Sequence, residues 1–159
     1  SLAELARHKP LGVRYIEEMP FNGVAGYKAK SIWDHEKILT RLRQAYPNMM
    51  STGYSPHGTA EKWHVPGFKG HLGIIAAASR TFCGSCNRLR LTPSGLLKTC
   101  LYDQGVVNLR DEIRSGVPDA QLLNTIETAI AGRARDGFEA ESKRPRGLRI
   151  MESMATIGG

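Results

Sequence analysis

The chain contains three cysteines, Cys83, Cys86 and Cys100, with the spacing Cys-x2-Cys-x13-Cys. Two cysteines in Cys-x2-Cys can direct both sulfurs at one centre, and a third can complete three corners of a tetrahedral metal site or of an iron–sulfur cluster. An odd number of cysteines fits a self-contained disulfide framework poorly. The spacing therefore favours metal ligation in a reducing compartment.

The fourth ligand position separates two kinds of metal site. A structural zinc site fills all four positions, so zinc would need one of the histidines, none of which stands in a local pattern with the cysteines: His8, His35, His57, His64, His71. A [4Fe-4S] cluster held by three thiolates would instead leave one iron open for substrate. The spacing alone leaves zinc, iron–sulfur and uncoordinated cysteines open.

Two arginines directly follow the second cysteine. Arg88 and Arg90 are two residues apart on an expected strand, so both side chains should leave the same face. Two guanidinium groups can bind a polyphosphate through bidentate hydrogen bonds, although a solvated basic strand face is the alternative. A net charge of +7 and a pI near 9.6 also favour an anionic partner, unless they serve solubility alone.

No run of the sequence approaches the roughly 20 apolar residues of a membrane span, and no signal-peptide pattern opens it. We therefore expect no membrane partner and a cytoplasmic location. The chain opens on Ser1 within a helical pattern, so we expect a fragment, a processed product or part of a larger protein.

The elements that must position these residues follow from the patterning. Residues 2–7 predict the end of a helix and residues 12–17 a strand, which together make an αβ unit. Ser31 is expected to cap a helix that Pro47 ends, and glycines and prolines between residues 49 and 101 indicate a small antiparallel sheet.

Within that sheet, residues 88–92 and 96–101 predict a hairpin that returns Cys100 towards the other two cysteines. Asn108 and Pro118 then begin two helices, for which core packing is the expected role. Beyond residue 137 the chain is basic, and we expect it to be irregular. The fold class is thus α/β, or an α+β fragment.

The extended cysteine motif resembles a known family. Residues 82–92 and 95–101 closely resemble the C-terminal cluster motif of the GTP 3',8-cyclases (molybdenum cofactor biosynthesis protein A), which are radical S-adenosylmethionine lyases. Residues 13–20, residues 109–116 and the terminal Ile157-Gly158-Gly159 also match. The resemblance covers essentially the whole chain. It implies that this chain corresponds to the C-terminal half of such an enzyme.

The resemblance implies a fold and a division of the chain. The last strands of an incomplete TIM-like barrel would be followed by a small antiparallel sheet and C-terminal helices. Residues 1–30 would be the remnant of the radical S-adenosylmethionine barrel, residues 31–137 the C-terminal region with the 4Fe-4S site, and residues 138–159 an irregular tail ending in Gly-Gly.

The resemblance also implies site residues. Cys83, Cys86 and Cys100 would bind a second [4Fe-4S] cluster whose open iron takes the guanine base of GTP. Further GTP contacts would come from the two arginines, the Leu89 backbone between them and Arg14, whereas Met19 would lie beside S-adenosylmethionine. Gly158 and Gly159 would reach into the active site; a frayed terminus is the alternative.

This sequence departs from the family in lacking the N-terminal Cys-x3-Cys-x2-Cys motif. With three cysteines it cannot hold both clusters, so we expect it to be inactive without the N-terminal radical S-adenosylmethionine half. In that setting the chain would bind GTP for conversion to (8S)-3',8-cyclo-7,8-dihydroguanosine 5'-triphosphate in molybdenum cofactor biosynthesis, with a homodimer as a further expectation.

The second hypothesis is a zinc-stabilised basic module that binds nucleic acid. The first hypothesis predicts no nucleic-acid partner, and aromatic residues are not interleaved with the arginines as a stacking platform would require.

Overall fold

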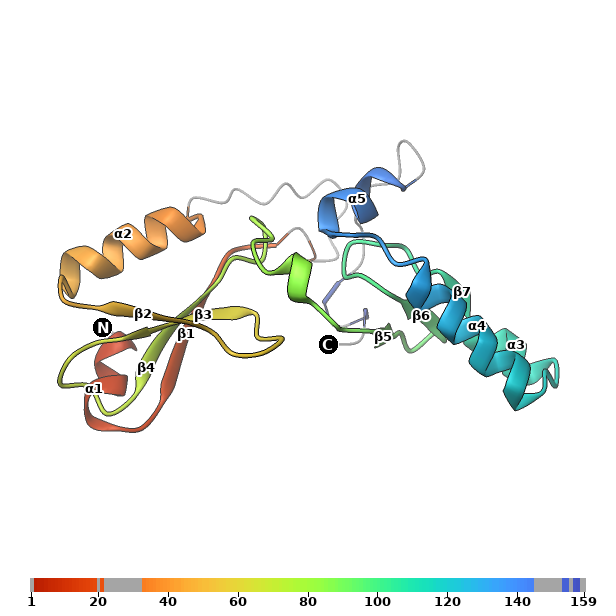
Figure 1. The fold of residues 1–159 in the computed structure, drawn as a ribbon, viewed down its shortest axis with the longest axis horizontal. Helices are drawn as coiled ribbons and strands as arrows, with labels where there is room; N and C mark the ends of the chain where they lie inside the picture. Colours follow the sequence, from red (N-terminus) through yellow and green to blue (C-terminus); the bar gives the residue numbers. More distant parts are fainter. Residues whose placement is uncertain (1, 20, 22–32, 145–152, 155, 158–159) are drawn as a thin grey trace. The chain divides into compact units, whose positions relative to one another are not determined.

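The structure is a computed structural model that describes residues 2–19, 21, 33–144, 153–154 and 156–157. The chain divides into two compact units (Figure 1). The first unit comprises Ser1–Met19 and Ala29–Cys86, and the second comprises Pro20–Lys28 and Asn87–Gly159.

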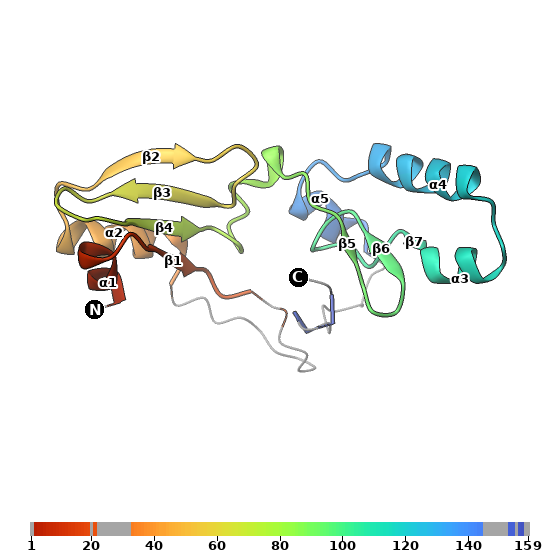
Figure 2. The same cartoon turned by 90° about the horizontal axis from the view of Figure 1, so that it is seen from below.

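The first unit is built on a four-stranded mixed sheet with the order β1-β4-β3-β2. Its elements are η1 (Leu2–Glu4), α1 (Leu5–His8), β1 (Gly12–Ile16), α2 (His35–Ala45), β2 (Met50–Tyr54), β3 (Ala60–His64), β4 (His71–Ile75) and η2 (Cys83–Ser85). Strands β1 and β4 pair in parallel, whereas β4–β3 and β3–β2 pair antiparallel, and Figure 2 shows the four strands side by side.

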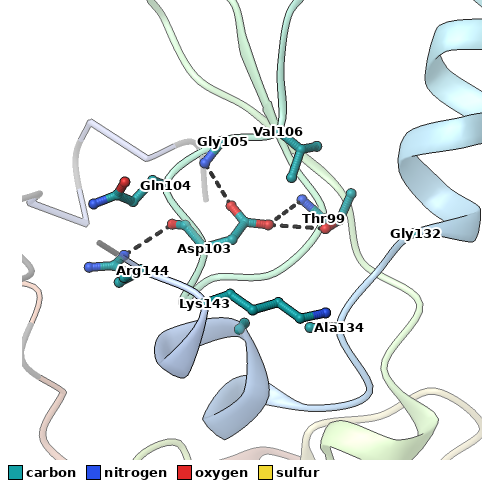
Figure 3. Close-up of a pocket in the computed structure, with 10 residues that line it drawn as sticks. Thr99, Asp103, Gln104, Gly105, Val106, Gly132, Ala134, Lys143 and Arg144 are labelled. Carbon is teal, nitrogen blue, oxygen red and sulfur yellow. Dashed lines mark hydrogen bonds between the residues drawn. The ribbon is translucent and has the colours of Figure 1, made fainter. Parts of the chain in front are cut away.

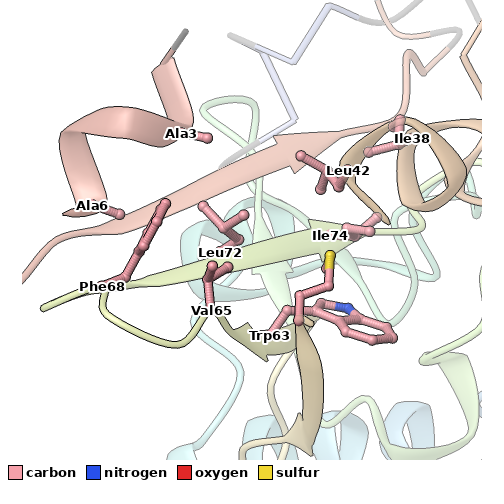
Figure 4. Packing of buried hydrophobic residues seen from close by; sticks show 10 residues of the cluster. Ala3, Ala6, Ile38, Leu42, Trp63, Val65, Phe68, Leu72 and Ile74 are labelled. Carbon is pink, nitrogen blue, oxygen red and sulfur yellow. The ribbon is translucent and has the colours of Figure 1, made fainter. Parts of the chain in front are cut away.

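The core of the first unit lies against one face of this sheet. Leu72 and Ile74 are two residues apart on β4, so both side chains lie on that face of the sheet. They pair in register with Val13 and Tyr15 of β1, which also pack against the core. Helical residues pack on the same cluster, as Figure 4 shows for Ala3, Ala6, Ile38 and Leu42. The sheet therefore has one packed face and a second face that carries polar residues of β1, β3 and β4.

Helix α2 begins one turn later than the sequence suggested. The Asp34 carboxylate accepts a hydrogen bond from the Lys37 amide at 2.9 Å and so caps the helix, whereas Ser31 lies outside the described residues. Ile38 and Leu42 are one helical turn apart and both buried. The predicted amphipathic core helix is thus confirmed, and it ends at Ala45 before Pro47.

The second unit contains a three-stranded antiparallel sheet with the order β5-β6-β7. Its elements are β5 (Arg90–Leu91), β6 (Leu96–Lys98), β7 (Val107–Asn108), α3 (Leu109–Arg114), α4 (Asp119–Ala131) and α5 (Gly137–Ser142). Gly95 has φ +83° in the turn between β5 and β6, and a Cβ there would lie 2.3 Å from the Arg110 Cβ. This turn therefore requires glycine.

Several predictions for the second unit were wrong in detail. The first hairpin strand covers two residues rather than 88–92, the second ends at Lys98 rather than Leu101, and β7 was not predicted. The capping residue Asn108 is confirmed, because its side chain accepts from the Asp111 amide. Helix α4 was expected to be core packing, yet none of its residues, all of which are described, is buried.

Helix α5 lies where irregular chain was expected. The Asp136 carboxylate accepts from the amides of Phe138 and Glu139 at 2.9 and 2.8 Å, which satisfies two amides at the start of this helix. The expectation of an irregular tail from residue 138 is therefore wrong for residues up to Ser142.

The mixed α/β class is confirmed. The incomplete barrel stays a prediction, as do the three predicted ranges apart from the irregular structure expected at residues 138–142. The strand at residues 12–16 was assigned to a separate barrel remnant, but it pairs with β4 and so belongs to the same sheet as residues 50–75. Among the described residues, no helix is both long and apolar enough to cross a bilayer.

Candidate functional site

Cys83 and Cys86 lie on one tight turn of the first unit. The 3-10 helix η2 spans Cys83–Ser85, and the Cys86 amide donates to the Cys83 carbonyl at 3.2 Å. Both cysteines are half-buried, and neither is in a disulfide. A turn of this kind places two sulfur ligands close together in sequence and space, as Cys-x2-Cys metal sites require.

The loop between β2 and β3 supports this turn. The Tyr54 hydroxyl lies 3.2 Å from Thr81 Oγ1, and His57 Nδ1 donates to the Ser85 carbonyl at 3.2 Å. A histidine therefore lies beside the cysteine turn without any local sequence pattern. Within the described residues, no three His, Cys, Asp or Glu side chains are arranged to hold a metal ion.

Glu17 ties the segment before the cysteine turn to the rest of the first unit. Its fully buried carboxylate accepts hydrogen bonds from the Ala78 amide at 2.7 Å, from the Ser79 amide and hydroxyl at 2.7 Å each, and from the His35 amide at 2.6 Å. Burial alone would raise the pKa of Glu17, but the hydrogen bonds outweigh burial and lower it. The carboxylate is thus held ionised and joins three segments of the chain.

Arg14 is exposed on the polar face of the four-stranded sheet. It pairs with Gly73 of β4, which in turn pairs with Lys62 of β3, so the two cations flank a glycine in one row across the strands. A Cβ at Gly73 would lie 3.2 Å from Arg14 Cγ. Burial, then Lys62 and Arg14, lower the pKa of His71, as expected for a positively charged surface.

Met19 is half-buried, and Glu17 lies two residues before it. The structure gives it no contact that indicates a ligand, so its assignment to S-adenosylmethionine stays a prediction. Gly158 and Gly159 lie outside the described residues, whereas the preceding Ile157 is fully buried.

Cys100 lies in the second unit, on the turn that follows β6. The Tyr102 amide donates to Cys100 Sγ at 3.4 Å, and the Cys100 amide donates to the Asp103 carboxylate at 2.7 Å. The Tyr102 amide thus helps to orient the sulfur, as hydrogen bonds to metal ligands do. The cysteine is half-buried and outside any disulfide.

The two arginines of the motif differ in their setting. Arg90 lies in β5, directly across from Lys98 of β6, and its Nε is buried with no hydrogen-bond partner within the described residues. Arg88 and Leu89 precede the strand, so the argument that one strand face carries both arginines is wrong. Arg90 and Lys98 are thus two basic residues paired across the hairpin.

The three cysteines are divided between the two units: Cys83 and Cys86 belong to the first, and Cys100 to the second. The sequence placed Cys100 on the second hairpin strand, but it follows the last strand residue, Lys98, by two positions. That the hairpin returns it towards the other cysteines stays a prediction.

Sequence reasoning missed two carboxylates that hold the cysteine-bearing segments. Asp103 could have been found, because Thr99, Asp103 and Gly105 lie close together in a turn-rich sequence and aspartate often accepts local amide hydrogen bonds. Glu17 had no comparable signal, since its partners lie 18, 61 and 62 residues away.

Comparisons with known proteins agree with the motif. The family described as Molybdenum Cofactor Synthesis C matches residues 11–138. The chain is 36% identical over 157 residues to a GTP 3',8-cyclase of Moorella thermoacetica, with 99% of this chain and 47% of that protein covered. It is 40% identical over 136 residues to molybdenum cofactor biosynthesis protein 1 of Dictyostelium discoideum, covering 80% of this chain and 20% of that protein.

A human protein of the same name, molybdenum cofactor biosynthesis protein 1, is 38% identical over 133 residues, which cover 84% of this chain and 21% of that protein. The chain thus spans less than half the length of these relatives. The family match includes all three cysteines, Arg14, Arg88 and Arg90. The chain belongs to the Molybdenum Cofactor Synthesis C family.

Proposed function

We propose that this chain is the GTP-binding, cluster-bearing C-terminal portion of a GTP 3',8-cyclase. Cys83, Cys86 and Cys100 would hold one [4Fe-4S] cluster. The observation that carries the proposal is the state of these cysteines: all three lie in the described part of the chain, are half-buried, and are outside disulfides.

The donor set fits a cluster better than a closed zinc site. Three thiolates suffice for a [4Fe-4S] cluster with one open iron, whereas structural zinc needs a fourth protein ligand. When bound, the cluster would supply an open iron to which the guanine base coordinates. The chain's own contribution is to orient GTP, which is catalysis by positioning.

Arg90 carries the anion-binding part of the proposal. Its buried Nε lacks a partner within the described residues, and it faces Lys98 across the hairpin. A triphosphate would accept hydrogen bonds from this guanidinium. Arg88, the Leu89 backbone and Arg14 are proposed as further GTP contacts, in keeping with the basic sheet row that Arg14 shares with Lys62.

The radical chemistry is proposed to need another part of the enzyme. The three cysteines of this sequence can supply one cluster, so a second cluster that cleaves S-adenosylmethionine requires ligands from elsewhere. Met19 is proposed to contact S-adenosylmethionine beside that second cluster. By itself this chain should bind GTP without converting it.

Anaerobic iron–sulfur reconstitution followed by metal and sulfide analysis tests the proposal. We expect about four irons and four sulfides per chain. Cys100→Ser should abolish retention of the cluster although both cysteines of the first unit remain. One zinc per chain without sulfide would overturn the proposal and favour the zinc module.

GTP binding to the reconstituted chain extends this experiment. Replacing Arg88 and Arg90 together with alanine should weaken GTP binding by about tenfold or more, because charge-assisted hydrogen bonds are lost. Arg110→Ala is the matched control, since Arg110 is exposed in the same unit and already pairs with Asp111 at 2.9 Å. Equal affinity in the double variant and the control would remove both arginines from the site.

A further inference from the structure

The turn that carries Cys100 is organised by a single carboxylate. Asp103 Oδ2 accepts hydrogen bonds from the Thr99 amide at 2.8 Å, the Thr99 hydroxyl at 3.0 Å and the Cys100 amide at 2.7 Å. Its Oδ1 accepts from the Gly105 amide at 2.9 Å. Figure 3 shows the carboxylate between Thr99 and Gly105, with its two oxygens directed to the two sides of the turn.

The same turn is held from outside by Arg144. Its Nε donates to the Tyr102 carbonyl at 2.6 Å, and its Nη2 donates to the Asp103 carbonyl at 3.0 Å. Arg144 comes shortly after α5 and binds two carbonyls of the turn, whereas the Asp103 side chain binds three of its amides. Three amides and two carbonyls of the turn are thereby paired.

These contacts fix the cysteine itself. The Cys100 amide is bound directly by the carboxylate, and the next hydrogen bond in the turn runs from the Tyr102 amide to Cys100 Sγ. Thr99 is buried and precedes the cysteine, so its two bonds to Asp103 hold the chain on the other side. The position of the sulfur therefore depends on Asp103 through the backbone of the turn.

We infer that Asp103 is a positioning residue for the third thiolate ligand, which it presents in a fixed orientation before the cluster binds. The inference rests on the proposed function for the identity of the ligand. It goes beyond that function by assigning Asp103 to the site. It also assigns Arg144, which holds the same turn through the Tyr102 and Asp103 carbonyls. Hydrogen bonds that orient a ligand in this way commonly change metal affinity by about 10–100-fold.

Amide hydrogen exchange of the full metal-free chain tests the positioning directly. In Asp103→Asn, the amides of Thr99, Cys100 and Gly105 should exchange about tenfold faster or more, because one ionised acceptor is lost. Protection in α4 should be unchanged and reports that the second unit remains folded. Asp119→Asn is the matched control, because Asp119 is exposed at the start of α4. Unaltered exchange around Cys100 in Asp103→Asn would overturn the inference.

The reconstituted protein provides a second measurement. Asp103→Asn should release iron to a chelator about tenfold faster or more and should change the electron paramagnetic resonance spectrum of the reduced cluster. Faster exchange together with unchanged iron release and spectrum would also overturn the inference. If the unsubstituted chain takes up no cluster, the proposed function fails, whereas the exchange measurement still decides whether Asp103 holds the turn.

A milder variant covers the case in which Asp103→Asn does not fold. Thr99→Val keeps the side-chain shape and removes only the hydroxyl bond to Asp103. We expect exchange at Cys100 to accelerate and iron release to quicken by a smaller factor. Values equal to those of the unsubstituted chain for both measurements would contradict the inference.

Discussion

In each unit one buried or partly buried carboxylate accepts several hydrogen bonds, in the first unit from the segment ahead of Cys83 and in the second from the turn that carries Cys100. The two carboxylates bind partners at very different distances along the chain. In the first unit, Glu17 accepts four hydrogen bonds from residues 18, 61 and 62 positions away. In the second unit, Asp103 also accepts four, from residues two to four positions away. One carboxylate joins three segments of tertiary structure, whereas the other shapes a single turn.

The units also differ in how their helices contribute to a core. Helix α2 places Ile38 and Leu42 in the cluster around Leu72, whereas no residue of α4, a fully described helix, is buried. The long-range contacts of Glu17 thus belong to a unit with a packed sheet face. The contacts of Asp103 are local to one turn. We expect a disturbance of the first core to reach Glu17 and its segment, and a disturbance of α4 to leave the Cys100 turn intact.

The largest expected effect comes from the core. Leu72→Ala removes a fully buried side chain from the centre of the first unit and should lower the free energy of unfolding by about 2–5 kcal/mol. Leu123→Ala is the matched control in α4, where Leu123 is 57% exposed, and it should change stability by about 0.5 kcal/mol or less.

Denaturant unfolding, followed separately in each unit by hydrogen exchange, measures both leucine variants. Similar losses for Leu72→Ala and Leu123→Ala would contradict the contrast between a packed and an open helix face. Loss of protection around Cys100 in Leu72→Ala would show that the Asp103 turn depends on the first core after all.

A smaller effect is expected from Glu17. Glu17→Gln keeps the shape of the side chain but replaces the charged carboxylate by a neutral amide. One end of that amide is an NH2 group, which can only donate and would therefore face backbone amides that also only donate. We expect the free energy of unfolding at pH 7 to fall by about 1–3 kcal/mol. Glu36→Gln, at an exposed position in the first turn of α2, is the matched control and should change it by about 0.5 kcal/mol or less.

The pH profile of the same two proteins separates charge from packing. The folded-state pKa of Glu17 is lowered from 4.5, so its stabilising contribution is complete above the unfolded pKa and disappears as the pH falls through the folded pKa. The difference between the unsubstituted chain and Glu17→Gln should therefore be constant near neutral pH and shrink below about pH 4.5. A difference that persists unchanged to lower pH would assign the effect to packing.

The sequence alone determined the features that depend on neighbouring residues. The spacing of Cys83, Cys86 and Cys100, the capping role of Asn108 and the turn at Gly95 are all encoded within a few positions of the chain. The cysteine motif was also sufficient to identify the family that the comparisons show. Predictions failed where the local signal was weak. The strand β5 covers only two residues, and the short helix α5, capped by Asp136, lies where irregular chain was predicted.

Only the tertiary structure decided which distant residues meet. The parallel pairing of β1 with β4 places Glu17 beside residues 78–79, ahead of Cys83, and nothing near Glu17 in the sequence specifies those partners. The structure also assigns the three cysteines to two different units, whereas the sequence motif alone suggested that they belong to one. The physical reason is that a hydrogen bond within a turn needs only local geometry, whereas one across 60 residues requires the sheet register and the packed core to form first.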